Sequence, residues 1–181
     1  QDIAQWVMNH RDRLDACYNR LLARRIDAWT IHVHGDFHLR QFLNTGKDFV
    51  FIDFGGEPRQ LLGKRSQRRS PLVDVAGMLR SFDYARHAAL RRQNPEDLPL
   101  IEPWGERWFH TICTHYLAGY FAATAAAPFR SNNREAVEML LHAFLLDKAL
   151  VELEYELGRR PRFAGTPLRG IQQMLDRGGE I

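Results

Sequence analysis

Three oxygen-bearing side chains in one short stretch of the sequence could take part in chemistry. Asp36 follows a brief apolar run, the amide Gln41 comes five residues later, and Asp53 ends a second apolar run. Phosphoryl transfer to a hydroxyl needs one carboxylate that accepts the proton of the hydroxyl, and an amide oxygen with a second carboxylate that hold Mg²⁺ against the nucleotide phosphates. The order corresponds loosely to the patterns H-x-D-x-x-x-x-N and D-F-G, and it predicts kinase chemistry for this stretch.

A short hairpin is expected to bring the two carboxylates together. His32–His34 is predicted as a brief strand before the loop that holds Asp36, and Phe49–Ile52 as a strand that ends at Asp53. The polar segment Asn44–Asp48 contains a glycine and is typical of a hairpin turn. If this hairpin forms, the two carboxylates approach each other at one end of it.

Two segments resemble known kinases. HGDFHLRQ resembles the catalytic loop of the aminoglycoside-phosphotransferase-like kinases, and IDFGGEP followed by KRSQRRSPLVDVAGMLRSFDYA is most similar to the bacterial maltokinases. The resemblance covers residues 31–89, with a weaker stretch at 147–163. It implies a mainly α-helical α+β fold over residues 1–181, the single C-terminal lobe of a protein-kinase-like enzyme, with the active site on a small hairpin. It also implies ATP as co-substrate, maltose as acceptor (giving maltose 1-phosphate), and trehalose synthase as a fused or bound partner.

The resemblance assigns roles to individual residues. Asp36 becomes the catalytic base, and Gln41 and Asp53 become ligands of Mg²⁺ or Mn²⁺. Gln41 stands where most kinases of the wider group have Asn, and Gly55 stands where the maltokinase pattern has an acidic residue. Asp74 is expected to accept backbone N–H bonds from the catalytic loop, although a carboxylate in the first turn of a helix is also favoured by the helix dipole.

Other polar residues are candidates for support or for substrate contact. His32 and His34 are expected to be buried and satisfied by backbone hydrogen bonds, and His34 is expected to support the site. Lys148 lies on the apolar face of a predicted helix with Glu152 one turn later, so the two form either a buried pair or part of a sugar pocket. The candidate substrate-binding residues are His38, Lys148, Glu152 and Tyr155.

Three alternatives remain open. His32, His34, Asp36 and His38 alternate along the chain and could hold Zn²⁺ in a metallohydrolase, although Gly35 predicts that the strand ends before Asp36. The chain could also be a catalytically silent kinase-like module that docks on trehalose synthase. Another small-molecule kinase of the aminoglycoside and choline kinase group is the third alternative.

Composition limits the class of protein. The 181 residues are 45% apolar, enough for a core, and 25 basic against 22 acidic residues leave a net charge of +3, too mild to imply nucleic acid. Two cysteines, Cys17 and Cys113, favour a reduced, cytoplasmic compartment over a disulfide framework. No apolar run approaches the roughly 20 residues that span a membrane. We therefore expect neither a nucleic-acid nor a membrane partner.

The remaining pattern is helical. A carboxyl–guanidinium pair at Arg80 and Asp83 is expected on the surface of one helix, and the basic run Lys64–Arg69 is expected to be a solvated loop.

The segment before residue 31 lacks a Gly-rich turn and a Val-Ala-x-Lys run, so the lysine and covering loop that hold ATP are expected outside the chain, and these residues alone should be nearly inactive. Helices are predicted at residues 2–27, 70–92 with Ser70 as N-cap, 104–126, 134–157 (capped within 131–133 and stopped by Gly158) and 167–176, with a linker at 94–103.

Overall fold

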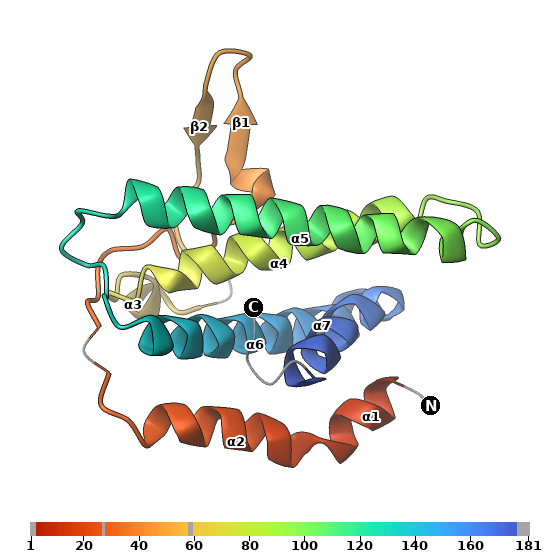
Figure 1. Ribbon diagram of the computed structural model, residues 1–181, viewed down its shortest axis with the longest axis horizontal. Helices are drawn as coiled ribbons and strands as arrows, with labels where there is room; N and C mark the ends of the chain where they lie inside the picture. Colours follow the sequence, from red (N-terminus) through yellow and green to blue (C-terminus); the bar gives the residue numbers. More distant parts are fainter. Residues whose placement is uncertain (1–2, 27, 58–59, 177–181) are drawn as a thin grey trace. The chain divides into compact units, whose positions relative to one another are not determined.

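The computed structural model describes residues 3–26, 28–57 and 60–176, and it is mainly helical with a single two-stranded sheet in that part of the chain. This confirms the predicted balance of helix and strand. The chain divides into two compact units, residues 1–29 with 131–181 and residues 30–130, and the elements of each are labelled in Figure 1. None of the described helices is long and apolar enough to cross a membrane.

The unit formed by the two ends of the chain is a set of packed helices. Its core holds Leu146 and Ala149 of α6 and Ile171 of α7, all with no exposed surface, together with Val7 of α1 and Cys17 of α2. The apolar side chains of α6 therefore face the neighbouring helices of its own unit. The elements are α1 (Ile3–Asn9), α2 (Arg11–Leu22), α6 (Arg134–Arg159), the 3₁₀ turn η2 (Pro161–Phe163) and α7 (Gly165–Asp176).

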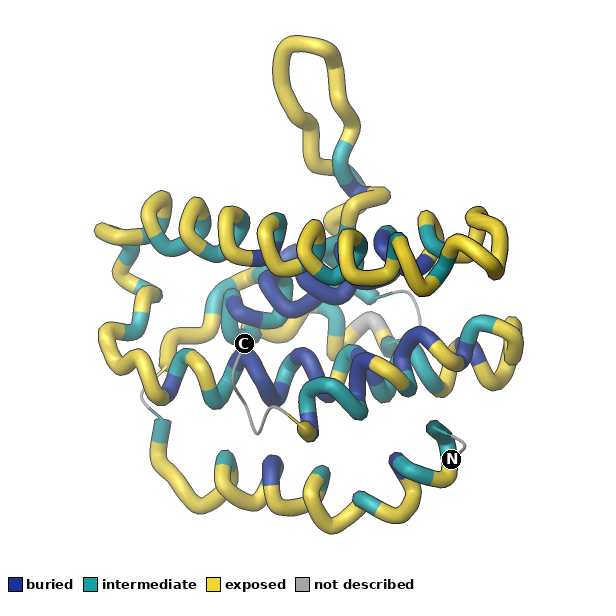
Figure 2. The backbone as a smooth tube through the Cα atoms, turned by 45° about the vertical axis from the view of Figure 1, so that its right-hand side comes forward, coloured by how far each residue is buried: buried dark blue, intermediate teal, exposed yellow. Residues whose placement is uncertain are grey.

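The second unit is built on α4 (Leu72–Leu90), which packs against α5 (Leu98–Ala123). Most of α4 is buried, as its dark blue colour in Figure 2 shows, and Val75 and Met78 are each 1% exposed. Phe82 meets Tyr116 of α5 edge to face, with ring centroids 5.6 Å apart. A helix buried over most of its surface is a rigid support for the loops that cross it.

The ion pair predicted on the surface of α4 is buried, so that prediction was wrong. Asp83 is 1% exposed and accepts hydrogen bonds from Arg80 at 2.8 Å and Arg86 at 2.5 Å. Arg86 also pairs with Glu106 of α5 and lies over the Phe109 ring, 5.0 Å from its centroid. Charges withdrawn from water are tolerated only when paired, and here the pairing links the two helices.

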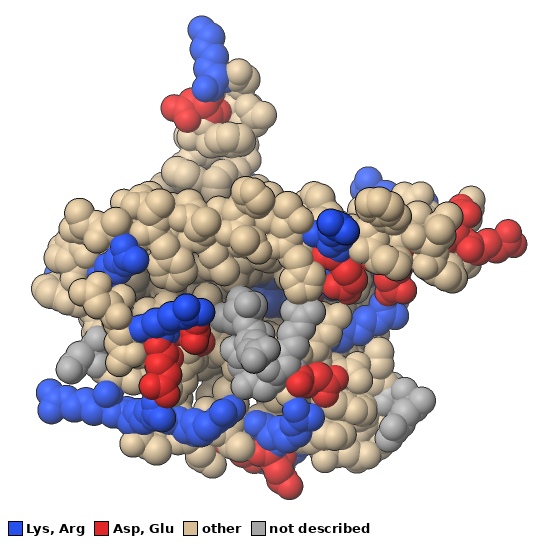
Figure 3. Space-filling view, viewed as in Figure 1, with Lys and Arg blue, Asp and Glu red and all other residues tan. Residues whose placement is uncertain are grey.

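A hairpin extends away from α4 and α5 (Figure 1). Strands β1 (Phe42–Asn44) and β2 (Phe49–Phe51) pair antiparallel, with Phe42 opposite Phe51. The turn between them matches the predicted one, and Thr45 N–H donates to the carbonyl of Asp48 at 2.9 Å. Charged side chains of both signs stand at the outer end of the hairpin, whereas its stem carries none in the view of Figure 3.

Several predicted boundaries differ for local reasons. The helix predicted at residues 2–27 breaks at His10, so α1 and α2 are separate. The ring of His10 makes a hydrogen bond with the carbonyl oxygen of Trp6 at 2.8 Å, and its backbone N–H donates to the carbonyl oxygen of Val7. α5 begins six residues earlier than predicted, because Pro99 occupies its first turn, where no backbone N–H is needed.

The remaining helix ends are shifted by a few residues. α4 begins after Pro71, so Ser70 lies one position before the cap, and α6 runs through Gly158 to Arg159. Asn133 caps α6 as predicted, accepting from Ala136 N–H at 3.0 Å. The basic segment, predicted as a loop, contains the one-turn helix α3 (Leu62–Arg65).

Candidate active site

The loop that carries Asp36 is held by a side chain instead of by a sheet. Asp74, in the first turn of α4, accepts the backbone N–H of His34 at 2.7 Å and that of Gly35 at 2.8 Å. Ile31 pairs with Arg69 through two backbone bonds of 2.9 Å, but His32–His34 forms no strand. The strand prediction there was wrong because the Asp74 carboxylate takes the N–H groups that a neighbouring strand would have bound.

The surroundings of Asp74 pull its pKa in two directions. Burial raises the pKa of Asp74 above its ordinary value, while the Gly35 and His34 N–H groups and the charge of Arg69 act to lower it. Both carboxylate oxygens accept a backbone bond, which suits the ionised form. Asp74 therefore has the geometry of the supporting role expected from the sequence.

His34 joins the loop of Asp36 to the segment of Asp53. Its Nε2 lies 2.8 Å from the carbonyl oxygen of Ile52, so Nε2 donates and carries the proton. Its Nδ1 is left as an acceptor and receives the N–H of Asp36 at 3.4 Å. The ring is buried between Phe37 and Phe54, with centroid distances of 5.3 and 4.9 Å.

These contacts weigh against the zinc alternative. Both ring nitrogens of His34 are engaged by the backbone, as predicted, whereas His32 is exposed and the prediction that it is buried was wrong. In residues 3–26, 28–57 and 60–176, no three His, Cys, Asp or Glu side chains lie together as a metal site would require. The alternating histidines in the sequence thus do not assemble into a nitrogen ligand set, because the strand that would align them is not formed.

Asp36 lies beside His38. The side chain of Asp36 is 15% exposed, and its Oδ2 lies 3.6 Å from Nε2 of His38, whose side chain is 28% exposed. The distance is too long for a good hydrogen bond but close enough for a protonated His38 to stabilise the Asp36 carboxylate. The structure therefore places His38, a candidate for substrate contact, against the candidate base.

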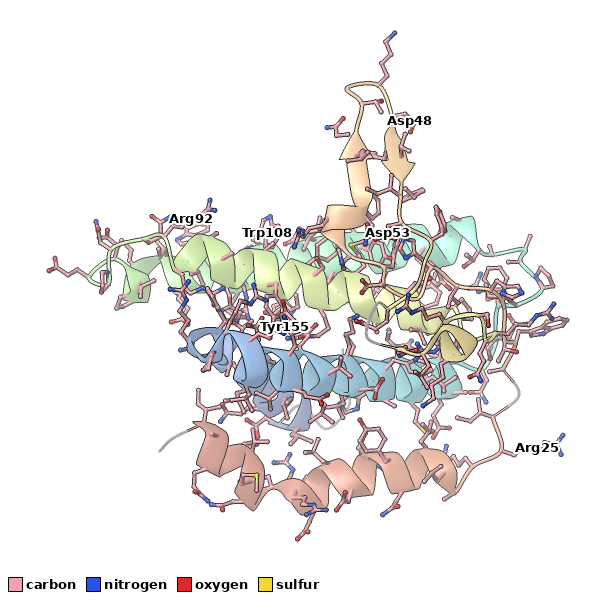
Figure 4. All side chains as sticks on the ribbon, turned by 180° about the vertical axis from the view of Figure 1, so that it is seen from behind. Arg25, Asp48, Asp53, Arg92, Trp108 and Tyr155 are labelled. Atoms are coloured by element: carbon pink, nitrogen blue, oxygen red, sulfur yellow. The ribbon has the colours of Figure 1, made fainter. Side chains whose placement is uncertain are left out.

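Gln41 and Asp53 stand at the base of the hairpin. The N–H of Gln41 closes the 3₁₀ turn η1 (Leu39–Gln41) onto His38 at 2.9 Å, and its carbonyl accepts the N–H of Ile52 at 3.1 Å. Figure 4 shows Asp53 where the chain leaves β2. Residues 41 and 53 are therefore held on adjacent segments, although the strand that pairs with β2 is Phe42–Asn44 and not the predicted His32–His34.

The side chains of Gln41 and Asp53 suit an oxygen-preferring cation. The Gln41 residue is 7% exposed, yet its amide has no hydrogen-bond partner among the described residues. The Asp53 carboxylate is exposed and likewise makes no hydrogen bond or ion pair within the described ranges. An amide oxygen and a carboxylate without a partner in the described part of the chain fit Mg²⁺ or Mn²⁺, which prefer oxygen ligands.

Close backbone packing holds the two loops at this point. Gly35 has φ of 80°, and a Cβ added there would lie 3.3 Å from Cα of Gly56, which has φ of 73°. Asp53 itself adopts φ of 60°, a left-handed conformation that Asp and Asn accept more readily than most residues. Glycine is favoured at positions 35 and 56 because both have positive φ, and a side chain at Gly35 would press on the backbone of the segment that follows Asp53.

The remaining candidates lie in the other compact unit. Lys148 and Glu152 are half-buried on α6, and Tyr155 is 36% exposed with the Arg160 guanidinium 5.0 Å from its ring centroid. Asp36, Gln41 and Asp53 belong to the unit of residues 30–130. A substrate role for these α6 residues thus stays a prediction.

Two residues outside the predicted site, Gly77 and Ser81, touch the loop. The carbonyl of Phe37 lies directly over Gly77 of α4, and the hydroxyl of Ser81 accepts the N–H of Leu39 at 3.1 Å. The available signal was the spacing of residues 74, 77 and 81, which places them on one face of a helix.

Known proteins similar to the chain are glucosamine kinases. The chain is 27% identical over 124 residues to the glucosamine kinase of Streptacidiphilus jiangxiensis, covering 57% of the chain and 28% of that relative. It is 27% identical over 149 residues to the glucosamine kinase of Mycolicibacterium smegmatis, covering 80% of the chain and 34% of that relative. The chain thus spans about a third of the length of these relatives. No family model matches it.

Solved glucosamine kinases share the fold. One crystal form superimposes with a TM-score of 0.82 at 21% identity, over 98% of the chain and 42% of the kinase. A glucosamine kinase in complex with glucosamine, ADP and inorganic phosphate superimposes with a TM-score of 0.69 at 22% identity, over 96% of the chain and 45% of that kinase. The chain therefore has the fold of part of a sugar kinase, which agrees with the kinase-like lobe expected from the motifs. The relatives named here are not maltokinases, so the acceptor is open.

Proposed function

We propose that the chain forms the acceptor and metal-binding part of an enzyme that phosphorylates a sugar hydroxyl with ATP. The observation that carries this proposal is the His34 link, which holds the Asp36 loop beside the Asp53 segment. The oxygens of Gln41 and Asp53, which have no partner in the described ranges, would form the metal site that phosphoryl transfer requires.

In this proposal each residue has a distinct task. Asp36 accepts the proton of the attacking sugar hydroxyl, and His38 beside it would stabilise the carboxylate when its ring is protonated. Gln41 and Asp53 would hold Mg²⁺, which when bound neutralises charge on the ATP phosphates. Asp74 and His34 keep the loop in place, because they take up the backbone groups that would otherwise let it move.

Glucosamine is the acceptor that we consider best supported. The curated relatives and the solved structures that share the fold are named as glucosamine kinases. Maltose is the second candidate, favoured by the resemblance of the DVAGMLRSFDYA segment to maltokinases. A docking role toward trehalose synthase rests on that motif resemblance alone.

The ATP phosphates need further ligands. We propose that a lysine and a covering loop lie in a part of the enzyme beyond these 181 residues, because the chain spans only about a third of the length of its curated relatives. The 181 residues alone should then bind ATP weakly and turn over slowly. Calorimetry with ATP on this segment measures that affinity, and a micromolar dissociation constant would contradict the proposal.

A coupled assay of ADP formation by the full-length protein tests the function. We expect Mg²⁺-dependent ADP formation with glucosamine that exceeds the rates with maltose, glucose, N-acetylglucosamine and choline. A rate highest with maltose would transfer the assignment to the maltokinase type. If no sugar raises ADP formation above the background hydrolysis of ATP, the proposed function is wrong.

The metal preference provides an independent check. Oxygen ligands from Gln41 and Asp53 predict activity with Mg²⁺ or Mn²⁺ and no tightly held zinc. Metal analysis of the purified protein should find no stoichiometric Zn²⁺. One zinc per chain that disappears in His34→Ala would favour the hydrolase alternative.

A further inference from the structure

One face of α4 supports the loop that carries the candidate base. Three α4 residues on this face, at positions 74, 77 and 81, meet consecutive parts of the loop. Asp74 binds the N–H groups at its start, Gly77 faces its middle, and Ser81 accepts the N–H of Leu39 at its end. Asp36 lies between the first and second of these contacts.

The contact at Gly77 leaves no room for a side chain. A Cβ added at Gly77 would lie 2.5 Å from the carbonyl oxygen of Phe37, 3.6 Å from its carbonyl carbon and 3.9 Å from its nitrogen. Real Cβ atoms essentially never approach other atoms within 3.0 Å, so the neighbour would have to move by about half an ångström. The neighbour is backbone and cannot turn away as a flexible side chain would.

The contact at Ser81 fixes the other end of the loop. Leu39 begins the turn η1, which ends at Gln41. Because Ser81 holds the first N–H of this turn, it influences where the Gln41 amide stands relative to Asp36. The hydroxyl of Ser81 on the supporting helix thus binds a residue two positions before Gln41, the candidate metal ligand.

We propose that Gly77 and Ser81 are positioning residues that set the place of Asp36 and Gln41 relative to the transferred phosphoryl group. The proposal rests on the proposed kinase function. Gly77 does so by letting the Phe37 carbonyl lie against α4, and Ser81 by binding the N–H of Leu39. Displacement of a catalytic group by a fraction of an ångström to one ångström lowers the rate of the chemical step more than it lowers substrate binding.

Helix propensity predicts the opposite result for Gly77, which makes the test sharp. Alanine is a better residue than glycine inside a helix, so Gly77→Ala should stabilise the protein and leave the rate unchanged if the loop contact had no role. A matched control exists in Gly119 of α5, where an added Cβ would meet no atom within 4 Å. Both changes add one methyl group to a helix of the same compact unit.

The test compares the two alanine variants in the full-length protein. We expect Gly77→Ala to lower kcat by about 10- to 100-fold, with KM values for ATP and sugar within about threefold of wild type. Gly119→Ala should keep the wild-type kcat. Hydrogen exchange followed by mass spectrometry should show faster exchange in peptides covering residues 34–39 for Gly77→Ala only, because the amides of His34 and Gly35 lose their alignment with Asp74.

Ser81 keeps the test decisive if Gly77→Ala fails to fold. Ser81→Ala should lower kcat several-fold and Ser81→Thr, which retains the hydroxyl, should restore it. Wild-type kcat and loop exchange in a folded Gly77→Ala protein, or in Ser81→Ala, would overturn the proposal for that residue. If the wild-type protein shows no sugar-dependent ADP formation, the proposed function fails, and the exchange measurement alone then decides whether α4 positions the loop.

Discussion

Removing the charge of Asp83 should destabilise the protein strongly. Asp83 is 1% exposed and binds Arg80 at 2.8 Å and Arg86 at 2.5 Å, with Nε2 of His87 3.5 Å from one of its oxygens. Asp83→Asn keeps the shape of the side chain but leaves two buried guanidinium groups with less compensating charge. Breaking a buried ion pair from one side costs about 3–5 kcal/mol, a large part of the 5–15 kcal/mol that stabilises a typical domain.

Urea unfolding followed by circular dichroism measures this cost. The control is Glu138→Gln, which removes one partner of an exposed pair with Arg134 on α6 and should leave the unfolding midpoint close to wild type. We expect Asp83→Asn to lower the free energy of unfolding by about 3 kcal/mol or more. A loss below about 1 kcal/mol would show that the cluster is hydrated in solution and that the reasoning from burial is wrong.

Further predictions concern the loop and the buried thiols. Asp74→Asn should lower kcat about tenfold, because an amide offers one acceptor oxygen to two backbone N–H groups. Burial raises the pKa of Asp74, so the folded state binds a proton at this carboxyl more readily than the unfolded state, and protonation at acidic pH adds stability. Protonation also removes one acceptor for the backbone N–H groups of the loop, so kcat in a pH series should fall before the free energy of unfolding does. This fall of kcat at acidic pH should be absent in Asp74→Asn. Burial raises the pKa of Cys113 to about 12 and that of Cys17 above its ordinary value, so both thiols should react slowly with a disulfide reagent at pH 8 until urea unfolds the protein. His38→Gln should lower kcat if His38 acts on Asp36 and raise KM for the sugar if it binds substrate, which steady-state kinetics separates.

The hairpin turn, the strand after it and most helices could be predicted from the sequence because their signals are local. The turn before Phe49 carries its own glycine and polar residues, and Asn133 caps α6 with a bond to a residue three positions later. Such signals need no knowledge of the rest of the chain. The predicted turn at Asn44–Asp48 and the predicted strand before Asp53 agree with the hairpin, whereas its first strand, β1 (Phe42–Asn44), was not predicted.

The wrong predictions depended on contacts between distant residues. His32–His34 has a strand-like pattern, but Asp74, forty residues after His34, binds the N–H groups that a strand would use. The pair of Arg80 and Asp83 has the spacing of a surface pair, and only the packing of α5 over α4 shows that it is buried. Sequence spacing identifies which groups could pair, whereas tertiary packing decides how much water surrounds them.

The most direct test of the account is the turnover of Asp36→Asn beside Asp48→Asn in the full-length protein. Both changes replace a carboxylate with an amide. Asp36 lies in the loop whose backbone N–H donates to the ring of His34, whereas Asp48 lies in the exposed turn at the outer end of the hairpin (Figure 4). With saturating ATP, Mg²⁺ and glucosamine, Asp36→Asn should lower kcat by at least about 100-fold with an unchanged unfolding curve, and Asp48→Asn should match wild type. A folded Asp36→Asn protein that phosphorylates sugar at a rate near wild type would contradict the assignment of Asp36 as the base.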